Sequence, residues 1–101
     1  MKILLVCNAG MSTSMMAMNL EEEIKKNGDS AVIEAVPVSE IDMHLEHVDV
    51  ILLGPQIRFA FDEIKEKYPD VLVMVISPQD FGSMNAVNVL KDIKKELQNM
   101  R

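Results

Sequence analysis

The segment K-I-L-L-V-C-N-A-G-M-S-T-S, residues 2–14, decides how the rest of the sequence is interpreted. Lys2–Val6 is a short apolar run without alternation, typical of a strand buried on both faces of a parallel sheet. Small and hydroxyl residues follow, and Thr13–Asn27 then has helical periodicity, with Gly28 suited to the stop. Its apolar positions form one stripe: Met16, Ala17, Leu20 and Ile24. The segment therefore predicts a strand, a turn and a helix.

The same succession of strand and helix continues along the chain. Three further apolar runs predict strands, at Val32–Val36, Val48–Leu53 and Val71–Ile76. Glu34 inside the second run indicates an edge strand. Helical patterns cover Ser39–His47, the stretch after Gly54-Pro55 that carries Ile57, Ala60, Phe61, Ile64 and Tyr68, and about Ser83–Asn99.

This alternation predicts an α/β fold with a four-stranded parallel sheet and helices on both faces. The common doubly wound order for four such strands is 2-1-3-4. At 101 residues, the chain is expected to form one domain, residues 1–101.

Composition narrows the classes of function. The net charge of −6 argues against binding to nucleic acid or to anionic lipid, and leaves open a protein partner with a basic patch. A single cysteine excludes an internal disulfide and a multi-cysteine metal site, and a free thiol favours the cytoplasm. No window approaches 18 apolar residues, so we expect no insertion into a membrane.

The predicted strand order places a candidate site at the carboxyl ends of the first and third strands. These strands lie side by side and their connections leave to opposite faces, which is where ligands bind in doubly wound folds. Cys7 ends the first strand, and Gly54-Pro55-Gln56 follows the third. Two separate segments should therefore converge on one crevice.

The turn from Cys7 to Ser14 has the composition of an anion-binding loop. Successive backbone N–H groups and a helix N-terminus would favour a thiolate, or a phosphoryl group carried by the sulfur. Gly10 allows a tight turn, and the hydroxyls of residues 12–14 can cap the helix. The alternative is that Cys7 is only a small buried apolar residue and that the hydroxyls are only a helix cap.

Three stretches resemble the IIB components of the bacterial sugar phosphotransferase system, lactose/cellobiose (chitobiose) class. C-N-A-G-M-S-T-S, residues 7–14, resembles the phosphocysteine loop of that family. L-L-G-P-Q-I-R, residues 52–58, and V-I-S-P-Q-D-F-G-S-M-N, residues 75–85, resemble its segments after strands three and four, although relatives often have Tyr-Gly where this chain has Phe81-Gly82. The resemblance covers essentially the whole chain.

The resemblance implies a phosphoryl carrier. A IIB component accepts a phosphoryl group from a phosphohistidine of its IIA partner and passes it to a sugar that enters through the membrane partner IIC. Cellobiose, chitobiose, lactose and other β-glucosides are all candidate sugars. Cys7 would be the nucleophile, with no cofactor, and Gln56 and Asp80 would border the pocket. The phosphate cradle would comprise Asn8, Ala9, Gly10, Met11, Ser12, Thr13 and Ser14.

Two other functions remain open from the residues. Low-molecular-weight tyrosine phosphatases use a cysteine at the same point of a similar, flavodoxin-like fold, but they have arginine six residues later, where this chain has Thr13. Asp80 could protonate the leaving group, as an acid in those phosphatases must. The absence of an arginine that binds the phosphoryl group through two parallel hydrogen bonds nevertheless favours a phosphoryl carrier. A regulatory or redox thiol module is the other alternative, although C-x-x-C is absent.

The remaining candidates concern contacts and metals. Met11 and Met15 are expected to be exposed near the site, where they could contact a partner protein. Arg58 could meet an acidic partner surface or a phosphate, although a solvated arginine on a helix is favoured. His44 and His47 lie three residues apart without a third ligand, so a solvated face is favoured over a metal site.

Overall fold

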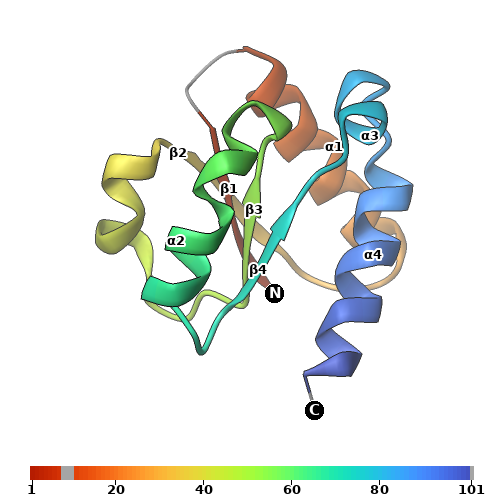
Figure 1. Cartoon of the computed structure of the whole chain (residues 1–101). Helices are drawn as coiled ribbons and strands as arrows, with labels where there is room; N and C mark the ends of the chain where they lie inside the picture. Colours follow the sequence, from red (N-terminus) through yellow and green to blue (C-terminus); the bar gives the residue numbers. More distant parts are fainter. Residues whose placement is uncertain (8–10, 101) are drawn as a thin grey trace.

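The structure is a computed structural model that describes residues 1–7 and 11–100, without the side chains of Met11 and Ser12. Its centre is a four-stranded, all-parallel sheet of order β2-β1-β3-β4 (Figure 1). The strands are β1 (Lys2–Val6), β2 (Val32–Val36), β3 (Val50–Leu53) and β4 (Leu72–Val75). The predicted fold class and strand order are both confirmed.

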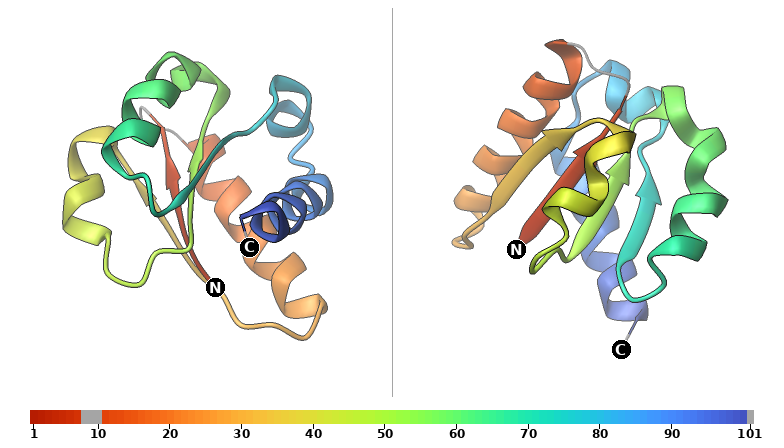
Figure 2. Two further views of the ribbon diagram at one scale, coloured as in Figure 1. Left: turned by 60° about the horizontal axis from the view of Figure 1, so that its bottom comes forward. Right: turned by 90° about the vertical axis from the view of Figure 1, so that its left-hand side faces the viewer.

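Helices cover both faces of the sheet. The helical segments are α1 (Met11–Lys26), η1 (Val38–His44), η2 (Pro55–Ala60), α2 (Phe61–Lys67), α3 (Pro78–Gly82) and α4 (Ala86–Asn99), where η denotes a 3₁₀-helix. The two views of Figure 2 show α1 and α4 on one side of the sheet, and η1 and α2 on the other. This division places the connections from β1 and from β3 on opposite faces, as a doubly wound sheet requires.

Successive side chains of β1 point to opposite faces of the sheet and enter two separate cores. Ile3 and Leu5 pack with α1 and α4, whereas Leu4 and Val6 pack with η1, η2 and α2. All four side chains are fully buried, and each such side chain contributes about 1.5–3 kcal/mol relative to exposure. A strand that is apolar at every position is therefore explained by helices on both sides.

The register brings the carboxyl ends of the strands to one level. Val6 lies opposite Val36 on one side and Leu53 on the other, and Leu53 lies opposite Val75. The residues that follow these strands consequently share one edge of the sheet, at the top of Figure 1.

Two helices differ from the prediction. α1 begins at Met11, two residues before the expected start. The last helix was expected from Ser83, but α3 precedes it and α4 begins only at Ala86. The interruption has a local cause, because Met84 adopts a φ of 54° and the Asn85 side chain accepts the N–H of Asn88 at 3.0 Å as an N-cap.

The helix after β3 is also irregular. It starts as the 3₁₀ segment η2, which contains a non-helical Ile57 (φ −119°, ψ 26°), and becomes α-helical at Phe61. Ile57 and Ile64 are nevertheless buried, as the stripe predicted. At the end of α2, the Tyr68 hydroxyl donates to the carboxylate of Asp42 in η1.

The edge strand β2 carries the expected charge. Glu34 is half-buried and its carboxylate lies 2.8 Å from Nδ1 of His44. His44 therefore has a specific partner, which the sequence did not indicate. Across the described part of the chain, no helix has the length and hydrophobicity needed to cross a membrane.

Candidate functional site

Cys7 follows the central strand β1 directly and is buried, with 6% of its surface exposed. β1 is flanked by β2 and β3, so the thiol lies at the end of a strand that has a neighbouring strand on each side. The neighbouring connection is close, because the N–H of Gly54 donates to the carbonyl of Val6 at 2.9 Å. The two segments expected to converge therefore lie side by side at the ends of β1 and β3.

Thr13 is the residue whose side chain meets the thiol. It lies in the first turn of α1 and is 4% exposed, and its Oγ1 forms a hydrogen bond with Cys7 Sγ. Either group can be the donor, so the pair can adjust to a thiol or a thiolate. The start of α1 at Met11 places Thr13 inside the first turn of the helix. That the hydroxyls of residues 12–14 cap this helix stays a prediction.

Gly54 allows Gln56 and Cys7 to approach the same point. A Cβ on Gly54 would lie 2.8 Å from Oε1 of Gln56 and 3.1 Å from Cβ of Cys7. Both distances are shorter than ordinary van der Waals contact, so a side chain here would displace one of the two residues. The absence of a side chain at Gly54 thus lets the amide of Gln56 fold back toward the cysteine.

Asp80 is engaged with α4. Its carboxylate oxygens accept from the Asn88 side-chain amide at 3.0 and 3.2 Å, and its backbone N–H donates to Ser77 Oγ at 3.1 Å. The structure thus brings Thr13, Gly54 and Gln56 to Cys7, while the recorded partners of Asp80 lie in α3 and α4.

Part of the expected cradle lies outside the described residues. This applies to Asn8, Ala9 and Gly10, and to the side chains of Met11 and Ser12. Ser14 is described and its side chain is exposed.

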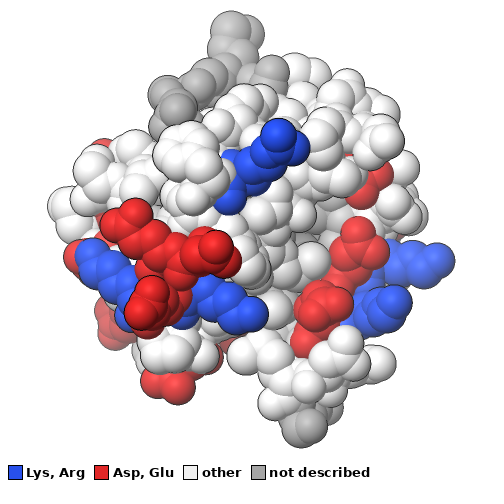
Figure 3. Space-filling view, in the orientation of Figure 1, with Lys and Arg blue, Asp and Glu red and all other residues white. Residues whose placement is uncertain are grey.

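Apolar side chains are exposed on the helices that leave the site. Met15 in α1 is 53% exposed and Phe59 in η2 is 80% exposed, with the exposed Arg58 beside it. Figure 3 shows a surface that is largely uncharged in the upper half, whereas charges gather lower, over α2 and α4. Among the residues described, Arg58 makes no ion pair.

Phe59 was missed from the sequence. The signal was its position off the stripe that includes Ile57, Ala60 and Ile64, since an aromatic residue on the polar side of a helix has no core to enter.

Within residues 1–7 and 11–100, no three His, Cys, Asp or Glu side chains are grouped to hold a metal ion. His44 pairs with Glu34, and the exposed His47 lies 3.7 Å from the carboxylate of Glu46. Both histidines thus have acidic partners on the protein surface.

Comparisons with known proteins give a consistent family. A family model described as "PTS system, Lactose/Cellobiose specific IIB subunit" matches residues 2–92. The galactose-specific and cellobiose-specific EIIB components of Lactococcus lactis are each 37% identical over 95 residues, covering 87% of this chain and 88% of theirs. The oligo-beta-mannoside-specific EIIB component of Bacillus subtilis is 32% identical over 83 residues, covering 80% and 81%.

Solved structures agree with this family. The cellobiose-specific phosphotransferase IIB component of Borrelia burgdorferi has a TM-score of 0.77 and 37% identity, covering 98% of this chain and 93% of that one. The lactose-specific IIB domain of Streptococcus pneumoniae has a TM-score of 0.79 over 91% and 95% of the two chains, and at 14% identity it supports the fold alone. The chain belongs to the lactose/cellobiose-specific IIB subunits of the phosphotransferase system and is a sugar-specific phosphotransferase component of sugar transport.

Proposed function

We propose that Cys7 carries the phosphoryl group on its way from a IIA protein to a β-linked sugar. The observation that carries this proposal is the buried contact between Cys7 Sγ and Thr13 Oγ1 at the carboxyl end of the central strand. A hydroxyl that can both donate and accept stays bonded to sulfur in either protonation state. Family membership adds the reaction in which such a thiol takes part.

Two displacements at phosphorus make up the reaction. In the first, the Cys7 thiolate attacks phosphorus, the S–P bond forms, and the P–N bond to the IIA histidine breaks with the electron pair returning to the imidazole. In the second, a sugar hydroxyl oxygen attacks, the O–P bond forms, the hydroxyl proton is lost to a base, and the S–P bond breaks to restore the thiolate. Thr13 Oγ1 is the nearest described donor for a phosphoryl oxygen on the sulfur.

The same contact favours a carrier over a hydrolase. Residue 13 is the position at which the phosphatases carry arginine, and a threonine hydroxyl cannot form the bidentate bonds of a guanidinium. The candidate acid, Asp80, already accepts two hydrogen bonds from Asn88. The site lacks an arginine, and its candidate acid is already hydrogen-bonded. It can therefore hold a phosphoryl group on the sulfur while giving little assistance to hydrolysis by water.

The partners follow from this chemistry. A IIA protein supplies the phosphoryl group, and a membrane-embedded IIC protein presents the sugar on the cytoplasmic side. Met15, Arg58 and Phe59 are exposed on the two helices that leave the site, so we expect them at these interfaces. Met11 and the cradle of residues 8–14 complete the proposed surface, and Gln56 lies beside Gly54 on the side of Cys7.

The substrate is proposed at the level of a class. Relatives of similar identity are named for galactose, cellobiose and oligo-beta-mannosides, so similarity to them does not single out one of these sugars. We assign a β-linked disaccharide or β-glucoside, with selection by the IIC partner.

Transfer to Cys7 is tested by mass spectrometry. The protein is incubated with phosphoenolpyruvate, the general phosphotransferase proteins and a cognate IIA. One phosphoryl group on Cys7 is expected in the wild type and none in Cys7→Ser. If IIA is phosphorylated but Cys7 stays unmodified, the proposal fails. Hydrolysis of an aryl phosphate at enzyme-like rates, lost in Cys7→Ser, would instead establish the phosphatase alternative.

A further inference from the structure

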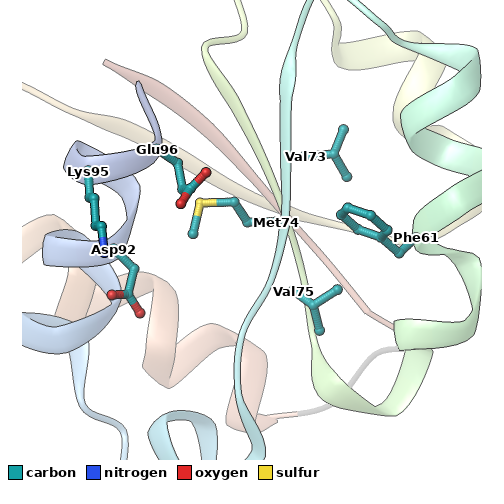
Figure 4. A pocket seen from close by; sticks show the side chains of 7 residues that line it. All are labelled: Phe61, Val73, Met74, Val75, Asp92, Lys95 and Glu96. Atoms are coloured by element: carbon teal, nitrogen blue, oxygen red, sulfur yellow. The ribbon is translucent and has the colours of Figure 1, made fainter. Parts of the chain in front are cut away.

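A groove runs along the open edge of β4, between α2 and α4. One hollow of about 360 Å³ is lined on the strand by Val73, Met74 and Val75 (Figure 4). A second, of about 400 Å³, shares Val73 with it and continues toward Met100. We refer to both together as the edge groove. It follows the side of the sheet, away from the carboxyl edge that holds Cys7, so an occupant would not cover the sulfur.

The edge groove exposes peptide groups that no strand of this chain pairs, because β4 is the last strand of the sheet and pairs with β3 alone. The N–H of Ile76 donates to the carbonyl of Leu53 in β3 at 2.9 Å. Since successive residues of a strand direct their peptide groups to opposite sides, Met74 also faces β3, whereas Val73 and Val75 direct N–H and C=O outward. An edge of this kind is a template for another strand.

The two edges of the sheet are protected differently. β2 carries Glu34, whose carboxylate lies beside His44, and a charge within an edge strand discourages pairing with another chain. β4 (L-V-M-V) has no charge, and the side chains of Val73, Val75 and Phe61 on one of its faces are apolar (Figure 4). The β4 edge therefore lacks the protection that β2 has.

The two faces of β4 offer different surroundings to an added strand. On the α2 side, Phe61 lies beside Val73 and Val75, so this side suits apolar side chains (Figure 4). On the α4 side, the half-buried Glu96 points toward Met74, and among the residues described it forms no ion pair. This side suits a side chain that is apolar along its length and positive at its end, as lysine and arginine are.

The other charges of the edge groove leave this carboxylate without compensation. Asp92 and Lys95 line the same hollow as Glu96, and both are exposed on α4 with opposite charges. Lys65 of α2 lines the second hollow and is not part of the first. Because Asp92 and Lys95 balance each other, the excess charge of the first hollow is the negative charge of Glu96. The net charge of −6 on the whole chain also favours a basic occupant.

We propose that the edge groove binds an extended segment of a partner protein in which apolar and basic residues alternate. The segment adds to the sheet beside β4, where side chains at one level share a face. Residues opposite Val73 and Val75 are apolar and pack against Phe61. The residue opposite Met74 is lysine or arginine, whose methylenes cover Met74 and whose charge reaches Glu96. β4 itself has no basic residue, so a second copy of this chain does not match the pattern.

Binding is tested with a short capped peptide in which valine and lysine alternate. Isotopically labelled protein is titrated at moderate salt, and the resonances of its backbone N–H groups are followed by nuclear magnetic resonance. Those of Val73 and Val75 should move, since their outward N–H groups become hydrogen-bonded, while that of Cys7 stays in place. A peptide of the same sequence with methylated backbone nitrogens cannot donate to the outward carbonyls of β4 and should not bind.

Charge reversal tests the role of Glu96. Glu96→Lys places two lysines together and should weaken binding of the valine–lysine peptide about tenfold or more. A second peptide, in which valine and glutamate alternate, should bind the wild type poorly and Glu96→Lys well. Because a gain of binding requires a folded groove, this exchange of preference separates a lost contact from a lost fold.

Glu22→Lys is the matched control, because Glu22 is exposed on α1 and the substitution changes the net charge equally. It should leave binding of both peptides little changed. The proposal is overturned if the resonances of Val73 and Val75 do not move, if both peptides bind the wild type equally, or if the two substitutions weaken binding equally. Resonances of Val73 and Val75 that move with the concentration of protein alone would assign the edge groove to a second copy, which also overturns it.

Discussion

Two connections of the sheet, the one after β1 and the one after β4, join a strand to a helix at the same edge but use their polar side chains differently. After β4, the Ser77 hydroxyl caps the short α3 and the Asp80 carboxylate is bonded to Asn88. After β1, the buried hydroxyl of Thr13 bonds the thiol of Cys7. The two connections thus differ in what their polar side chains bond: the sulfur in one, and the backbone and a neighbouring amide in the other.

The largest effect is expected at the sulfur itself. Cys7→Ser replaces a thiol by an alcohol that is a far weaker nucleophile at neutral pH, so transfer from phosphorylated IIA should fall by at least about 10³-fold, or ~4 kcal/mol in the barrier. The measurement is the rate of appearance of phosphorylated protein by mass spectrometry. Thermal unfolding should change little, since the two side chains are similar in size. If transfer to the variant were undiminished, Cys7 would not be the phosphorylated residue, and the connection after β1 would not differ in function from the one after β4.

The second effect is steric and concerns Gly54. In Gly54→Ala the new methyl group meets the Cys7 Cβ at 3.1 Å, an atom fixed by the backbone, so we expect a loss of about 1–3 kcal/mol in stability and slower transfer. Gly82→Ala is the matched control beside the β4 connection, because a Cβ there has no atom within 4 Å. Chemical denaturation and the transfer assay should both separate the two variants. If the two variants were equally stable and equally fast in transfer, the close approach of Gly54 to Cys7 would be unimportant for both properties.

The third prediction compares the hydroxyl of Thr13 with that of Ser77. Thr13→Val keeps the shape but removes the bond to sulfur, and should slow phosphoryl transfer about tenfold while Thr13→Ser retains it. Ser77→Ala removes a cap and should cost about 1 kcal/mol of stability without slowing transfer. Transfer rates and unfolding free energies, measured on all three variants, check both the expected effect on transfer and the expected effect on stability. Slower transfer in Ser77→Ala would contradict the distinction between a site and a structural turn.

The smallest effect belongs to a polar cluster away from both connections. The Tyr68 hydroxyl, and then Lys67 at 3.3 Å, hold the pKa of Asp42 below its usual value. A lowered folded-state pKa means that this stabilisation is present above about pH 4 and is lost as the pH falls through the lower folded value. Burial, then the hydrogen bond to Asp42, raises the pKa of Tyr68, so its contribution is lost only as the pH rises above about 10.

Unfolding of Tyr68→Phe measured against pH checks this. The stability gap to the wild type should be constant near neutrality and should shrink at both extremes, and transfer to Cys7 should be unchanged. A gap that is the same at pH 3 and pH 7 would contradict the assignment to Asp42.

Much of the fold could be predicted because it rests on local patterns. Four apolar runs alternating with helical patterns gave the fold class, the common doubly wound order gave the strand order, and the charge at Glu34 indicated one edge. The start of α4 could not be predicted, since a positive φ at a methionine leaves no mark in the sequence. The partner of Thr13 was equally hidden, because a shift of two residues in the start of a helix decides whether a hydroxyl caps the backbone or faces the sulfur.

The burial of Thr13 bears on how loops of this kind diversify. Only 4% of its surface is exposed and its hydroxyl touches the sulfur, so the much longer side chain of arginine has no space to occupy at this position. A change from relay to hydrolase therefore cannot arise from one substitution at residue 13. The packing around residue 13 has to change first, and a chain with that change but no arginine gains nothing from it. Close packing around one small hydroxyl thus separates two neighbouring chemistries by an evolutionary barrier.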